Sequence, residues 1–254
     1  MSKRKNSSPI TGFRDWLGCL ESVRDQRPLW PVLLGQALNH EFIRQRDSVD
    51  SYAGSIFKDR DNHPLGDGER EERLVARLYR AAHAADGCVD LFGERIWLIG
   101  FQWPTQGASA EKSRRADLVG LTAEGGLVVF EAKVATGTPP LHALCEGLDY
   151  LACLLRPVNF LKIEVGFHAW TQKPGKIIPE GFKTTRPLQT SKPKLVILAP
   201  ESYFTERYSR SIRGKEWPFL VDAGISLIPS IDLHFAATDF KSTELWEPKP
   251  HKVK

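Results

Sequence analysis

Cysteine is scarce in this chain of 254 residues, and its placement excludes the common cysteine-based sites. The four cysteines are Cys19, Cys88, Cys145 and Cys153, and no two of them form a C-x-x-C pair. None shows the paired cysteine and histidine spacing of a zinc site. We therefore predict reduced, buried cysteines that act as small apolar side chains.

Long apolar runs and a strong net charge are also missing. No apolar stretch has the length that a membrane-spanning helix needs. The basic start MSKRKNSSP is not followed by the apolar core of a signal peptide. We expect a cytoplasmic protein that does not bind a membrane. The net charge of +4 mildly favours a polyanionic partner, and basic residues gather at both ends of the chain.

The most informative stretch runs from Arg114 to Lys133 and has the sequence RRADLVGLTAEGGLVVFEAK. Two apolar runs flank the turn-forming residues 123–126, which predicts a β-hairpin. The second run is apolar on both faces, as expected for a strand that is buried within a layered domain. This buried hairpin nevertheless carries three charged residues, Asp117, Glu131 and Lys133.

The register of the hairpin decides whether these charges meet. Alternation along a strand puts Glu131 and Lys133 on the same face. A connection with an odd number of residues, such as 123–125, places Asp117 directly across from Glu131, because both are equally far from Glu124. Their Cβ atoms would then lie roughly 4.5–5.5 Å apart, which lets both carboxylates bind one cation. A two-residue turn would face Asp117 away from Glu131 unless a bulge intervened.

Two interpretations of this charged group stay open. Burying two carboxylates and an ammonium costs free energy unless they satisfy one another, so they could form a structural pairing at a sheet edge. Alternatively, they form a catalytic site. The full pattern favours the second interpretation: an acid on one strand, a turn, and then Glu-x-Lys on one face of an apolar strand.

This pattern resembles the core motif of the PD-(D/E)XK nuclease superfamily, which has the restriction-endonuclease-like fold. Asp117 takes the first acidic position, Glu131 the second and Lys133 the lysine. Ala116 stands where the family name has proline. The resemblance implies a Mg²⁺- or Mn²⁺-dependent hydrolase of phosphodiester bonds, in DNA more than in RNA, with the main-chain carbonyl of Ala132 as a further metal ligand. It leaves open whether the chain acts alone or as a homodimer.

The segments around the hairpin follow the order of that superfamily's core. Composition and apolar spacing predict a helix over 69–85, a first strand over 95–103 and another helix over 141–155. A short buried strand is expected over 194–200. The predicted fold class is therefore α/β: a restriction-endonuclease-like core with a mixed central β-sheet flanked by helices, in the order α-β-β-β-α-β.

Residues on the two flanking helices could complete the site. In the nuclease relatives, the helix before the first strand often offers a further acid to the metal. Glu71 shares a face with the apolar residues of its helix and is the better candidate, with Glu72 close behind, although acids also simply favour a helix N-terminus. Glu146 and Tyr150 have the spacing of the family's Gln-x-x-x-Tyr pair, with Glu in place of Gln. Tyr150 either hydrogen-bonds near the metal or packs.

Arginines near the hairpin and beyond it are candidate contacts for nucleic acid. Arg114 and Arg115 precede the first acid and would either hold a phosphodiester backbone or neutralise the acids in the absence of substrate. Arg207 and Arg210 lie on nearly one side of a helix predicted over 201–213, interleaved with aromatic residues.

The rest of the chain completes the predicted organisation. Amphipathic spacing predicts helices over 11–25 and 31–46, followed by a long loop over 48–68. The alternating segment 160–170 is predicted as a fourth strand, and 225–235 as a last apolar one. We divide the chain into an N-terminal helical extension with its loop (1–68), a nuclease-like α/β domain (69–236) and a basic C-terminal tail (237–254).

Two rivals to the enzyme stay open. One is a catalytically inactive module that keeps the fold and binds nucleic acid. The other is a scaffold in which the three charges form a structural network. Cleavage that depends on Mg²⁺ or Mn²⁺ would favour the enzyme. Binding of nucleic acid without cleavage would favour the inactive module, and the absence of both would favour the scaffold.

Overall fold

A computed structural model describes residues 70–105, 115–135, 140–155, 157–205 and 231–249. They form a mixed α/β fold in which a seven-stranded mixed sheet is flanked by helices. The helices predicted over 11–25 and 31–46 and the loop over 48–68 lie outside the described residues. Within the described part of the chain, no helix combines the length and the apolar character needed to cross a membrane.

The first four strands of the sheet are antiparallel neighbours that follow one another in the chain. They are β1 (Cys88–Leu91), β2 (Glu94–Pro104), β3 (Arg115–Leu121) and β4 (Gly126–Ala132). Because β3 and β4 run in opposite directions, β3 begins at the end of the sheet where β4 stops.

The remaining strands extend the sheet at both edges, to give the order β6-β5-β4-β3-β2-β1-β7. β5 (Gln189–Ala199) pairs in parallel with β4, and β6 (Asp232–Ala237) pairs in parallel with β5. The two-residue strand β7 (Glu244–Leu245) pairs in parallel with β1. The ends of β4, β5 and β6 therefore point to one end of the sheet.

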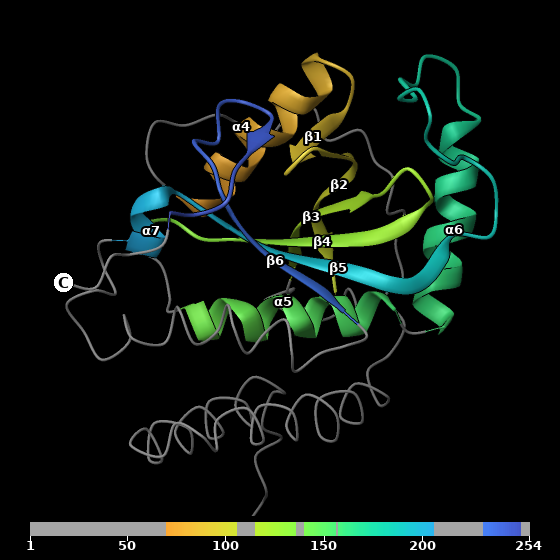
Figure 1. The fold of residues 1–254 in the computed structure, drawn as a ribbon. Helices are drawn as coiled ribbons and strands as arrows, with labels where there is room; N and C mark the ends of the chain where they lie inside the picture. Colours follow the sequence, from red (N-terminus) through yellow and green to blue (C-terminus); the bar gives the residue numbers. More distant parts are fainter. Residues whose placement is uncertain (1–69, 106–114, 136–139, 156, 206–230, 250–254) are drawn as a thin grey trace, which may run out of the picture.

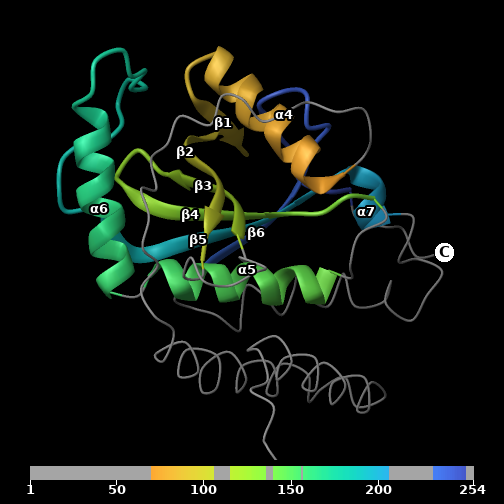
Figure 2. The same ribbon diagram turned by 180° about the vertical axis from the view of Figure 1, so that it is seen from behind.

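Helices cover both faces of this sheet, as Figures 1 and 2 show. α4 (Glu71–Ala84) packs on one face, over β1, β2 and β3, whereas α5 (Pro140–Leu154) lies on the other face across β4 and β5. α6 (Pro157–Thr171) follows α5, and the short α7 (Glu201–Thr205) follows β5. One apolar cluster fills the space between the sheet and α4, and another the space between the sheet and α5 and α6.

The helix predicted over 69–85 forms as α4 because its apolar residues are spaced to bury one side. Val75, Leu78 and Ala82 are all buried, at intervals of three and four residues. The helix predicted over 141–155 likewise matches α5, and the strand predicted over 95–103 matches β2, with one-residue differences at their ends.

The register of the β3–β4 hairpin is the one that brings its two acids together. Leu121 pairs with Leu127, and the backbone N–H of Thr122 donates to the carbonyl of Gly126, which leaves residues 123–125 as a three-residue connection. Its last residue, Gly125, has a φ of +88°, which suits glycine. The pairs continue outward without a shift. Extended by one more pair, this register sets Asp117 across from Glu131, as the odd-numbered connection predicts.

The segment predicted as a fourth strand is a helix, so that prediction is wrong. Residues 160–170 belong to α6, where Phe160, Ile163, Phe167 and Trp170 are buried. These residues recur at intervals of three and four, which is helical spacing. Apolar residues on the exposed side of the same helix produced the alternation on which the strand prediction rested.

Two strands are absent from the sequence-based prediction. β1 joins β2 through Phe92 and Gly93, which both have positive φ, in a two-residue turn that lacks the Asn-Gly or Asp-Gly signature. β7 lies within the segment 237–254 that was expected to be a basic tail. There, Trp246 and Ala237 exchange two backbone hydrogen bonds. Part of that segment is therefore bound to the sheet.

Three further predicted elements overlap the observed ones in part. β5 begins before the strand predicted over 194–200. β6 covers the end of 225–235, and α7 covers the beginning of 201–213. The other residues of these last two segments, apart from Ile231, lie outside the described residues.

Gly147 lets α5 approach the sheet closely. A Cβ atom at this position would lie 2.6 Å from Leu195 Cδ1 and 3.3 Å from Glu131 Cβ. A helix interior otherwise favours alanine over glycine by about 1 kcal/mol, so packing and not helix propensity accounts for the glycine. It sets the distance between α5 and the strand that carries Glu131.

We predict that Gly147→Ala lowers the free energy of unfolding by about 1–3 kcal/mol, because the clash with Leu195 outweighs the gain in helix propensity. Urea unfolding followed by circular dichroism measures the change. Gly166→Ala, at a partly exposed position of α6, is the matched control and should leave stability unchanged or raise it. A Gly147→Ala variant as stable as the wild type would contradict the close approach.

Candidate metal centre

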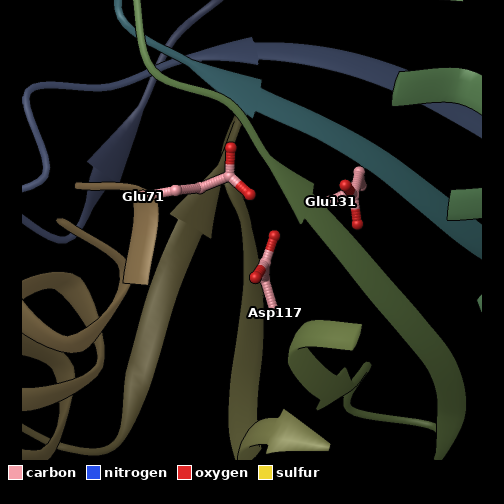
Figure 3. A group of neighbouring side chains, drawn as sticks. All are labelled: Glu71, Asp117 and Glu131. Atoms are coloured by element: carbon pink, nitrogen blue, oxygen red, sulfur yellow. The ribbon is translucent and has the colours of Figure 1, made fainter. Parts of the chain in front are cut away.

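Three carboxylates from three elements gather where β3 begins and β4 ends. Glu71 comes from the first turn of α4, Asp117 from β3 and Glu131 from β4, as Figure 3 shows. Each offers one oxygen atom, and these atoms lie within 4.8 Å of one another. The antiparallel pairing of β3 with β4 brings the two strand acids together, and Glu71 reaches them from the helix that covers the sheet.

Both carboxylate oxygens of Asp117 accept a hydrogen bond. The side-chain amide of Gln102 donates from Nε2 to Oδ1 at 2.9 Å, and the backbone N–H of Ala132 donates to Oδ2 at 2.8 Å. Burial raises the pKa of Asp117 to about 7, and the charge of Glu71 adds to the rise, against the opposing effects of Lys133 and the two hydrogen bonds. Each oxygen keeps a second lone pair for a cation.

Lys133 follows β4 directly, and its ammonium contacts acids from both helix layers. Its Nζ atom is in close contact with Glu131 Oε1, and lies 3.0 Å from Glu146 Oε2 and 3.5 Å from Glu71 Oε1. Burial alone would lower the pKa of Lys133, but the surrounding carboxylates, with Glu131 first, raise that pKa well above its usual value. Lys133 therefore carries its charge at neutral pH.

One oxygen of Glu131 is paired and the other is not. Oε1 accepts from Lys133, whereas the buried Oε2 accepts no hydrogen bond from the described residues. Burial raises the pKa of Glu131 well above its usual value in spite of the adjacent ammonium. A buried carboxylate oxygen without a partner costs free energy, and coordination to a cation would remove that cost.

The donor set suits a hard divalent cation. Mg²⁺ and Mn²⁺ prefer oxygen ligands, and Glu71, Asp117 and Glu131 supply three that converge. Burial raises the pKa of all three acids, and the charges of neighbouring carboxylates add to the rise, against the opposing effect of the Lys133 ammonium. This buried acidic triad could therefore hold a metal ion.

The second helix contributes two of the predicted residues. Glu146 of α5 contacts the ammonium of Lys133, as described above. Tyr150, one helical turn further along, is buried, and burial together with the charge of Glu131 raises its pKa. Ala132 contributes its backbone N–H to Asp117, and the role of its carbonyl as a metal ligand stays a prediction.

The structure separates the two acids at the start of α4. Glu71 joins the carboxylate cluster, whereas Glu72 is exposed and does not. Of the predicted arginines, Arg115 is exposed at the beginning of β3. The other three, Arg114, Arg207 and Arg210, lie outside the described residues.

Gln102 is a site residue that the sequence does not indicate. It belongs to no motif, and the alternation of β2 does not point it at the acids. Its contact with Asp117 depends on a shift of register within β2, which the structure reveals between Leu98 and Gly100.

Comparison with known proteins identifies no relative. No family model matches the chain, and searches of curated proteins and of solved structures give no match. The class of protein therefore rests on the fold and the site alone. It is a mixed α/β protein with a buried carboxylate cluster that could hold a metal ion.

We predict that Asp117 makes the metal-free protein less stable as the pH rises from about 4 to about 7. The pKa of Asp117 is about 7 in the folded state and close to 4 in an unfolded chain. Between these values the folded state holds a proton that the unfolded state has released, so a rise in pH favours unfolding. The stabilising effect is complete below pH 4 and lost above pH 7.

Asp117→Asn tests the predicted loss of stability with rising pH. The amide stays neutral, its oxygen can accept from Ala132, and its NH₂ group can donate to a Gln102 amide that has turned over. At pH 8 without metal we expect the variant to be more stable than the wild type, by on the order of 4 kcal/mol. Thermal unfolding at pH 5 and pH 8 with a chelator measures the difference. The raised pKa of Asp117 would be contradicted if the stability advantage of the variant over the wild type were smaller at pH 8 than at pH 5.

Proposed function

We propose that this chain is a nuclease that uses Mg²⁺ or Mn²⁺ to hydrolyse phosphodiester bonds in DNA, and that its fold is a restriction-endonuclease-like core of the PD-(D/E)XK superfamily. The observation that carries the proposal is the convergence of Glu71, Asp117 and Glu131, with the ammonium of Lys133 against the last of them. Asp117, Glu131 and Lys133, at the ends of two antiparallel strands, are the residues of the sequence motif, and Glu71 adds a third acid from α4.

The order of the elements supports the proposed fold. α4 precedes the strands. The strands β2, β3 and β4 are successive antiparallel neighbours, and α5 follows β4. β5 then pairs in parallel with β4. This is the α-β-β-β-α-β order expected from the resemblance, with β1 inserted between α4 and β2 and α6 inserted between α5 and β5.

Each residue of the cluster has a role in the proposed hydrolysis. Glu71, Asp117 and Glu131 would hold the cation, which supplies polarisation of the phosphate and a lower pKa for the attacking water. Lys133 would place a compact positive charge beside the phosphate, where negative charge develops in the transition state. Glu146 forms an ion pair with Lys133 and so holds the ammonium in place from the α5 side.

DNA is the proposed substrate on the grounds of charge and resemblance. The chain carries a net charge of +4 and is basic at both ends. Arg115 is exposed two residues before Asp117, on the same strand, so its guanidinium is well placed to contact a phosphodiester backbone that reaches the cation.

A structural ion network is the second candidate function, and the contacts of Lys133 with three carboxylates favour it. A network that served stability alone would be balanced in charge. Here the pKa of Glu71, Asp117 and Glu131 is raised, so the acids are held together at a cost. Groups of this kind gather at functional sites, which is why the nuclease is the better supported proposal.

Lys133→Met tests the role of the ammonium. We predict that cleavage of labelled DNA in Mg²⁺ or Mn²⁺ falls at least about 100-fold, because the transition state loses a fixed positive charge in a buried site. Binding of Mn²⁺, measured by calorimetric titration, should persist, because the three carboxylates remain.

Lys194→Met is the matched control. Lys194 is mostly buried and contacts Glu94 at 3.1 Å and also Asp232, outside the carboxylate cluster. Its loss removes an ion-paired lysine of similar kind and should leave cleavage unchanged. Equal cleavage by Lys133→Met and wild type would refute the catalytic role. DNA binding without cleavage by the wild type would favour the inactive module, and neither binding nor cleavage would favour the scaffold.

A further inference from the structure

Gln102 is buried in β2 in an unusual backbone conformation. Its φ is +48°, and its exposed fraction is 6%. Residues with long side chains seldom adopt positive φ, and such strain costs about 1–3 kcal/mol. A strained and buried polar residue persists only where the surrounding structure holds it.

A shift of register in β2 sets this residue beside the carboxylate cluster. The pairing between β2 and β3 shifts by one residue just before Gly100, and beyond the shift Phe101 pairs with Leu118. The next residue along, Gln102, therefore lies opposite Asp117. In the unshifted register, the apolar Phe101 would have faced Asp117. The bulge thus exchanges an apolar neighbour of the acid for a hydrogen-bond donor.

Packing fixes this irregular path. A Cβ atom on Gly100 would lie only 1.9 Å from Cε3 of Trp103, so the indole ring occupies the space that a side chain at position 100 would need. Trp103 is itself fully buried. The two residues interlock on either side of Gln102 and hold the strand in the shape that directs its amide to Asp117.

The Gln102 amide fixes the plane of the Asp117 carboxylate from one side. Its hydrogen bond to Oδ1 comes from β2, whereas the hydrogen bond from Ala132 to Oδ2 comes from β4. Two donors, on the two strands that flank β3, thus orient one carboxylate. Because the amide is neutral, it orients Asp117 without cancelling the negative charge that attracts a cation, which a lysine or arginine at this place would do.

We propose that Gln102 is a positioning residue of the metal centre, which presets the Asp117 carboxylate for a divalent cation through its hydrogen bond to Oδ1. The inference rests on the proposed function, since it requires that Glu71, Asp117 and Glu131 bind the ion.

Two substitutions test the hydrogen bond that Gln102 donates to Asp117. Gln102→Met keeps the length of the side chain and removes the amide. Gln102→Asn tolerates positive φ but holds an amide that is one methylene shorter. We expect the Kd for Mn²⁺, measured by calorimetric titration of the full chain, to rise about 10-fold or more in both variants, as is typical when a partner of a metal ligand is lost.

Thr122→Val is the matched control for the loss of a buried hydrogen bond. Thr122 is also 6% exposed, and its Oγ1 accepts from the backbone N–H of Gly126 at 3.0 Å, at the other end of the β3–β4 hairpin. This variant should unfold at a lower temperature than the wild type and bind Mn²⁺ with unchanged Kd.

The outcomes separate the two proposals. Weaker Mn²⁺ binding in both Gln102 variants, with unchanged binding in Thr122→Val, supports the positioning role. Unchanged binding in either Gln102 variant, or equal weakening in Thr122→Val, overturns it and leaves the proposed metal centre standing. A wild-type protein that binds no Mn²⁺ removes the metal centre itself, and the positioning role with it.

Discussion

The contact between Lys133 and Glu131 is the constraint on which the site depends. An ammonium this deeply buried would be driven to its neutral form unless carboxylates surrounded it. Those carboxylates come from β4, α4 and α5, so one charged group joins the sheet to both helix layers. Two of these acids, Glu71 and Glu131, also belong to the carboxylate cluster, so the ammonium and the candidate cation site lie against the same side chains.

Several local rules of protein stability are broken together at the carboxylate cluster. Asp117 is buried with a raised pKa, one oxygen of Glu131 has no partner among the described residues, and Gln102 has a strained backbone. Such a concentration of cost is expected where a protein gives up stability for function, and it is the reason why the site and not the fold carries the functional argument.

The sequence predicts those parts of the structure that depend on local patterns. The sequence left two registers of the hairpin open, and the structure has the one in which Asp117 and Glu131 are equally far from the turn centre. The preference for Glu71 over Glu72 follows from helical spacing. Residues 160–170 were mistaken for a strand because a short apolar run satisfies both periodicities, and the choice is made by packing against the sheet. The role of Gln102 could not be predicted, because the interlocking of Trp103 with Gly100 moves it into place, and no local pattern encodes that contact.

The position of Lys133 between the two layers has a consequence for the folding of the chain. A partly folded chain in which either α4 or α5 had not yet docked would lack Glu71 or Glu146, and its lysine would be solvated. The full constellation exists only once both layers have closed on the sheet. A nuclease of the kind proposed above would therefore complete its site only when both layers have docked.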